Sequence, residues 1–209
     1  MTDEPHNTSA RPDPALLNAR HPSSDEEWVA EFQKGSAQGF SILFDRYRQP
    51  VFGFFCRRIA DRAAAEELAQ ETFLALLRAL PRYRQETLFR VYLYAIAFKI
   101  LNRYRRKMAF RAAFLGMPDE QPEPGVSPGM EASLAVRQAV RQLDATDREI
   151  LLLRHFDLLS YAEIAKVLDL PINTVRSRLF RARAALRALL ETPPRAAMTH
   201  APLRSQEQA

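Results

Sequence analysis

The residues best suited to chemistry in this sequence are the arginine and hydroxyl side chains between positions 171 and 190, which could bind DNA. The stretch PINTVRSRLFRARAALRALL is rich in arginine and contains no acidic residue. On an ideal helical wheel, its polar side chains lie opposite or beside an apolar stripe. Arginine neutralises phosphates, and polar side chains in the first half of a helix can reach base edges. The base-edge candidates are Thr174, Ser177 and Arg178, and the phosphate candidates are Arg176, Arg181 and Arg183.

A second helix must lie directly before this one, because residues 160–168 show the same periodicity of apolar side chains. Ser160 is the expected N-cap, and Glu163 completes a capping box. Asp169 and Leu170 form the predicted turn, and Pro171 begins the next helix, where a missing N–H is tolerated. The spacing predicts a helix-turn-helix with helices at 160–168 and 172–190. A solvated basic helix in a simple bundle is the alternative.

Two further stretches in the first half of the chain carry strong and opposite charge. KILNRYRRKMAFR, residues 99–111, is basic, and the upstream LFRVYLYAIAF is rich in aromatic residues. Basic side chains bind phosphates and exposed rings stack on unpaired bases, although part of the aromatic spacing also suits a core. AAAEELAQETFLALL, residues 63–77, is acidic and would repel DNA, so we expect it to face a protein. The predicted helices are about 87–110 and 62–79, the latter capped by Asp61.

Composition excludes several classes of protein. The chain has 209 residues, 47% hydrophobic and 26% charged, with a net charge of +5. It has no apolar run near the roughly 20 residues that span a bilayer and no secretory signal, so we expect no membrane insertion. Cys56 is the only cysteine, which rules out an internal disulfide and fits a cytoplasmic protein. We find no phosphate loop, nucleophile elbow or metal-ligand spacing, and therefore expect no enzyme activity, cofactor or metal.

Proline and glycine divide the chain. We expect disordered tails at 1–23 and 192–209 and a flexible linker at 115–130, where GMPDEQPEPGVSPG excludes a helix. The compact segments are 24–114 and 131–191, with helical periodicity and no sustained strand pattern. The predicted fold is all-α, with two small helical domains joined by a flexible linker and a helix-turn-helix in the C-terminal domain.

The order of these motifs resembles one protein family. FSILFDRYRQPVFGFF, AAAEELAQETFLALLRAL, FRVYLYAIAF with LNRYRR, and LLLRHFDLLSYAEIAKVLDLPINTVRSRLFRARAALR follow one another as in extracytoplasmic-function (ECF) sigma factors of bacterial RNA polymerase. The resemblance covers nearly all of residues 26–190. AEELAQETF together with LSYAEIA and LPINTVRSRLFRAR is highly specific.

The resemblance implies a non-catalytic initiation factor. The segment 24–114 would be a sigma region 2-like domain that binds core polymerase and melts the minus-ten element, and 131–191 a region 4-like domain that reads the minus-thirty-five element. The implied polymerase-binding residues are Glu67, Gln70, Glu71 and Phe73. The implied minus-ten residues are Tyr83, Arg84, Gln85, Tyr92, Lys99, Asn102, Arg103, Arg105 and Arg106. Family members are commonly held inactive by an anti-sigma protein, which the resemblance also implies here.

The chain departs from the family pattern at a few positions. Tyr92, Ala95, Lys99 and Asn102 stand where the family often has Trp, Arg, Asn and Asp, and Asn173 replaces a usual glycine. The alternative interpretation is a transcriptional regulator with a similar helix-turn-helix that binds intact duplex as a homodimer. The acidic 63–79 segment and the basic, aromatic 88–111 segment favour the sigma factor.

Overall fold

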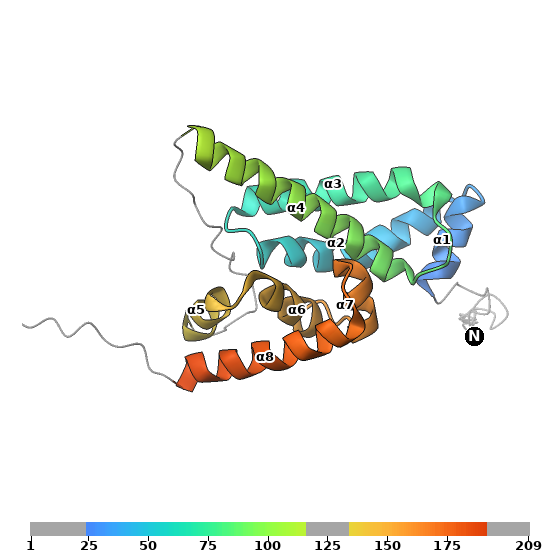
Figure 1. Cartoon of the computed structure of the whole chain (residues 1–209). Helices are drawn as coiled ribbons and strands as arrows, with labels where there is room; N and C mark the ends of the chain where they lie inside the picture. The colour runs from blue at the N-terminus through green and yellow to red at the C-terminus, as the bar shows by residue number, and fades with distance from the viewer. Residues whose placement is uncertain (1–23, 116–133, 192–209) are drawn as a thin grey trace, which may run out of the picture.

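The computed structural model describes residues 24–115 and 134–191, and these residues are helical with no strand (Figure 1). The all-α prediction is confirmed. The N-terminal domain contains α1 (Asp25–Gln33), α2 (Ala37–Cys56), α3 (Arg62–Ala79), a 3-10 turn (Leu80–Arg82) and α4 (Phe89–Leu115). The C-terminal domain contains α5 (Leu134–Gln142), α6 (Ala145–His155), α7 (Tyr161–Leu168) and α8 (Ile172–Glu191). The expected tails and residues 116–130 of the expected linker lie outside the described residues.

The helix ends follow the local signals in the sequence. The Asp61 side chain accepts hydrogen bonds from two backbone N–H groups of α3, and Ser160 with Glu163 forms the expected capping box of α7. Asp169 ends α7 in the left-handed conformation, with φ of 53°. The Pro171 carbonyl accepts a backbone hydrogen bond from the first turn of α8. The helix-turn-helix prediction is therefore confirmed at its caps and its turn. Helix α4 runs to Leu115, five residues further than the predicted end near 110.

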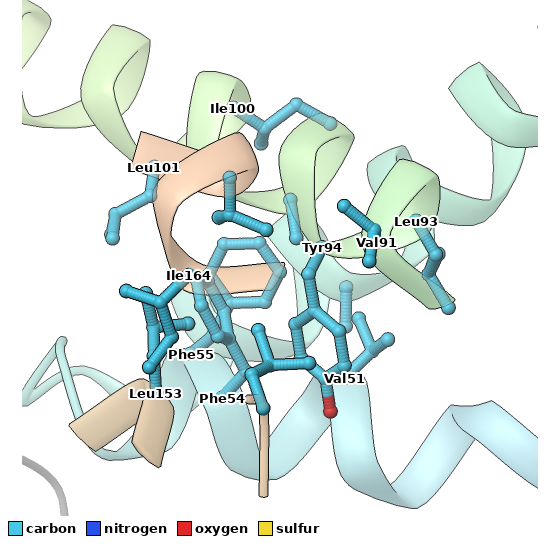
Figure 2. Packing of buried hydrophobic residues seen from close by; sticks show 14 of the residues in the cluster. Val51, Phe54, Phe55, Val91, Leu93, Tyr94, Ile100, Leu101, Leu153 and Ile164 are labelled. Atoms are coloured by element: carbon cyan, nitrogen blue, oxygen red, sulfur yellow. The ribbon is translucent and has the colours of Figure 1, made fainter. Parts of the chain in front are cut away.

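The two domains share one continuous apolar core, a contact that the sequence patterns did not predict. Helix α7 lies against α4, and α6 lies beside α2 (Figure 1). In Figure 2, Leu153 of α6 and Ile164 of α7 lie next to Phe54 and Phe55 of α2, with Leu101 of α4 close by. The first four of these side chains are fully buried, and so is Leu101. The structure therefore places the N-terminal and the C-terminal domain in direct contact.

Candidate nucleic-acid and protein interfaces

The outer face of α8 presents the basic side chains that the sequence predicted. Val175, Leu179 and Ala182 are buried against the rest of the C-terminal domain. This orientation leaves the opposite face open. Four of the predicted DNA-binding residues are exposed there: Arg176, Ser177, Arg181 and Arg183. Thr174 is half-buried, and its carbonyl accepts a hydrogen bond from the Ser177 hydroxyl. This face of α8 is thus accessible to solvent from Arg176 to Arg183.

Arg178 lies differently from its neighbours on this helix. Its Nη1 atom donates to Asp147 Oδ1 at 2.8 Å and to Asp144 Oδ1 at 3.2 Å, both at the start of α6. The hydrogen bond to Asp147 is the main cause that raises the pKa of Arg178. The side chain remains 31% exposed. Two carboxylates therefore hold one nitrogen of the guanidinium, and part of the side chain remains open to solvent.

The sequence analysis missed Phe180 as a surface residue. Its ring is 77% exposed and lies on the same helix as Arg176 and Arg181. It does not belong to the buried stripe of α8, and that position on the helical wheel was the signal that could have identified it. Phenylalanine can contact the methyl group of thymine in the major groove. Phe180 therefore joins the candidate DNA-contacting residues.

Helix α4 carries the second set of predicted DNA contacts. Lys99, Arg103 and Arg106 are exposed and Asn102 is half-buried. Arg105 donates to Glu149 Oε1 of α6 at 2.8 Å, so it is engaged by the other domain. The remaining exposed cations form a basic surface that can bind phosphates.

The segment before α4 separates into a buried and an exposed part. Tyr83 is buried, its ring lies 4.9 Å from that of Tyr92, and its hydroxyl donates to the Thr87 carbonyl. Burial raises the pKa of Tyr83 to about 12. Arg84 and Gln85 are exposed. Tyr83 is thus part of the packed interior of the domain. Of the three predicted DNA contacts in this segment, only Arg84 and Gln85 are exposed.

The acidic helix α3 borders an open hollow of about 310 Å³ between α2 and α3. Phe73 and Phe44 form an apolar part of its lining, with their ring centres 4.8 Å apart in an edge-on arrangement. Gln70 also lines the hollow, and Glu67 is exposed nearby on the same helix. Glu71 is half-buried and forms an ion pair with Arg103 of α4. A hollow lined by both aromatic and charged side chains is suited to a protein partner. Phe73 reaches that partner only as part of the lining, because it is 6% exposed.

Between the domains lies a group of five charged residues that we call the interdomain ion cluster. Arg58 bonds Glu149 at 2.7 Å and Asp157 at 3.1 Å, Arg57 bonds Asp157 at 2.6 Å, and Arg105 completes the group through Glu149. Burial alone would raise the pKa of Glu149, but Arg58 and Arg105 hold it below its ordinary value. The pairs join residues far apart in the sequence, so no local pattern could have revealed them.

Two further findings concern the described residues alone. Within residues 24–115 and 134–191, no group of three or more His, Cys, Asp or Glu side chains is arranged to hold a metal ion. No helix in these ranges is long and apolar enough to cross a membrane.

Comparison with known proteins decides the family. Residues 43–110 match the family model described as Sigma-70 region 2, and residues 133–186 match Sigma-70, region 4. The RNA polymerase sigma-H factor of Pseudomonas aeruginosa is 34% identical over 182 residues, which cover 80% of this chain and 94% of the relative. The ECF RNA polymerase sigma-E factor of Escherichia coli is 30% identical over 177 residues, covering 78% and 92%. The chain belongs to the ECF sigma factors of the sigma-70 family.

Solved structures agree with this family. The sigma factor resembles CnrH, solved in complex with the cytosolic domain of CnrY, with a TM-score of 0.62 at 25% identity over 80% of this chain and 97% of CnrH. It also shares its fold with RpoE of Bartonella quintana, solved with the anti-sigma factor NepR, with a TM-score of 0.62 at 22% identity over 75% and 99% of the two chains. Both domains of this sigma factor therefore have counterparts of known structure.

Proposed function

We propose that this ECF sigma factor directs promoter-specific transcription initiation by binding core RNA polymerase, melting the minus-ten element and reading the minus-thirty-five element. The observation that carries the proposal is the presence on one chain of both sigma regions, in order, over residues 43–110 and 133–186. The relatives that match along most of their length are sigma factors by name. A duplex-binding regulator that acts as a homodimer is therefore not favoured, and the family consists of non-enzymatic factors.

The N-terminal domain would contact the polymerase through α3. The exposed side chains of Glu67 and Gln70 and the adjacent hollow, which combines aromatic rings with charged side chains, offer a protein-binding surface. The basic face of α4, with Lys99 and Arg106, would follow the phosphates of the opened strand. Arg84 and Gln85 lie close in sequence to this helix and would contact unpaired bases of the minus-ten element.

The C-terminal domain would read the minus-thirty-five element through α8. The exposed Arg176, Arg181 and Arg183 suit phosphates, while Thr174, Ser177 and Arg178 are the proposed base contacts. Since the polymerase holds both domains on one promoter, neither helix has to bind tightly alone. Multivalent attachment raises the overall affinity without new contacts.

We further propose a cytoplasmic location, with the polymerase, and control by an anti-sigma protein. RpoE was solved with the anti-sigma factor NepR, and CnrH with the cytosolic domain of CnrY. The similarity of these complexed proteins to this chain supports a protein partner of the same type here.

The test is reconstitution with core polymerase and a promoter library, followed by sequencing of the transcripts. We expect transcripts that start at a defined promoter motif and depend on the added protein. The absence of any such transcript, together with tight dimeric binding to intact duplex, would instead identify a conventional regulator.

A further inference from the structure

The C-terminal end of α6 meets the outer face of α8 at two side chains, His155 and Arg183. Arg183 Nη2 lies 3.3 Å from His155 Nε2, and both side chains are exposed. We propose that this pair is a single binding site for one phosphate of duplex DNA, in which His155 positions Arg183 and takes up a proton when the phosphate binds. The proposal rests on the function proposed above, where Arg183 is a phosphate contact. It adds a residue outside α8 and a dependence on pH to that contact.

The hydrogen bond between the two side chains fixes where the proton of the imidazole lies. A guanidinium has N–H donors and no acceptor, so Arg183 donates and His155 Nε2 accepts. The ring is therefore neutral in the free protein and carries its proton on Nδ1. In the part of the chain that the structure describes, the ring forms no other hydrogen bond. The Nδ1–H group is thus a donor for a ligand, while the acceptor at Nε2 orients the guanidinium before binding.

The pair contains no carboxylate, which distinguishes Arg183 from Arg178 on the same helix. Arg178 is matched by Asp144 and Asp147 at the start of α6. Arg183 instead meets a neutral ring at the end of α6, so its positive charge is not neutralised within residues 24–115 and 134–191. A guanidinium beside a second N–H donor suits the several acceptor oxygens of one phosphate.

The charged groups around the ring oppose a second positive charge in the free protein. Partial burial is the main cause that lowers the pKa of His155, and the cations Arg183 and Arg154 lower it further. Arg154 is engaged within its own domain, since its Nη1 atom donates to the Leu159 carbonyl at 3.0 Å. Asp157, the acid nearest in sequence, is paired within the interdomain ion cluster. A bound phosphate would therefore supply the negative charge that favours the protonated ring.

Phosphate binding and protonation of His155 should reinforce each other. A phosphate that contacts both side chains attracts positive charge, so the pKa of His155 is higher in the complex than in the free protein. Between these two pKa values the affinity for DNA rises as the pH falls, by at most about tenfold per pH unit for one proton. Above the higher pKa the ring is neutral in both states, and below the lower pKa it is charged in both, so the dependence ends at either side.

The test follows the imidazole of His155 by NMR in the full chain, with and without a short mixed-sequence DNA duplex. A phosphate contact does not depend on base sequence, so neither the promoter nor the polymerase is needed. We expect the duplex to raise the pKa of His155. Across the same pH range, the slope of log affinity against log salt should steepen by up to about 0.9, the value for one more neutralised phosphate. An unchanged pKa with duplex overturns the proposal, and so does a change that appears only with core polymerase, which would indicate a protein contact.

His155→Gln separates positioning from protonation, because glutamine keeps an acceptor for Arg183 but cannot take up a proton. We expect this variant to bind the duplex like the parent where the ring is neutral, and to lose the gain in affinity at lower pH. His155→Ala also removes the acceptor and should bind more weakly at every pH. The matched control is His200→Gln, which removes an imidazole beyond α8 and should keep the full pH dependence. A full pH dependence in His155→Gln, or parent-like binding by His155→Ala at every pH, contradicts the proposal.

The NMR titration uses the unaltered chain, so it decides the question even if a variant is unstable. Its outcome is also separate from transcription. A chain whose His155 responds to the duplex but that starts no transcripts would refute the proposed function and leave the phosphate site standing. A chain that starts transcripts while His155 does not respond would refute the phosphate site alone.

Discussion

Replacing Arg178 by alanine separates two roles that the structure permits for this side chain. Its Nη1 atom bonds Asp144 and Asp147 at the start of α6, while part of the side chain remains exposed on α8. The side chain is 31% exposed, so the loss of the ion pair with Asp147 should lower the free energy of unfolding by no more than about 1 kcal/mol. A bidentate base contact is worth about 1–3 kcal/mol, which corresponds to a roughly 5- to 150-fold loss of affinity.

The assay is holoenzyme binding to a panel of promoters that differ at single positions of the minus-thirty-five element. For Arg178→Ala we expect a loss confined to promoters that carry the preferred base at one position, with other promoters little affected. Arg187→Ala is the matched control, because it removes the same charge from an exposed position of the same helix outside the proposed contacts. An equal loss on every promoter would show that Arg178 supports the fold or binds phosphate and does not read a base.

Three further predictions concern separate parts of the molecule. Glu71→Lys should weaken binding to core polymerase at least about tenfold with the fold intact, as measured by titration with labelled protein. Arg103→Ala is the control: it breaks the same ion pair and should leave the affinity for core polymerase unchanged. Gly39→Ala should lower the free energy of unfolding by about 1–3 kcal/mol in urea melts, because the added Cβ would lie 2.4 Å from the Trp28 carbonyl; unchanged stability would mean that α1 shifts freely. Burial and two neighbouring arginines lower the pKa of His155 below its ordinary value of 6.5, so the unfolded chain takes up a proton first and thermal stability should fall as the pH drops through about 6.5. His155→Gln should reduce this pH dependence.

Local features of the fold could be predicted because their causes lie within a few residues of each other. The capping box of Ser160 and Glu163 and the side-chain cap by Asp61 appear where the sequence places them. The buried stripe of α8 follows from the spacing of apolar residues. The exposure of Arg176 and Arg181 follows in turn, since the opposite face of a packed helix is left to solvent.

Features that depend on packing between distant segments could not be predicted. The family resemblance implies a minus-ten role for Tyr83 from its position, whereas nothing near it in the sequence indicates that its ring packs on Tyr92 and is buried. The interdomain ion cluster joins Arg58 to Glu149 across 91 positions of sequence. An arginine and a glutamate in separate helices show no pattern that pairs them, because each is also an ordinary surface residue by type.

The interdomain ion cluster contributes to the contact between the two domains mainly by specifying its geometry. Moving ions out of water costs several kcal/mol per ion, and the attraction within a buried cluster offsets about that amount, so the cluster specifies the arrangement more than it stabilises it. The apolar contact around Leu153 and Ile164 supplies the remaining stability.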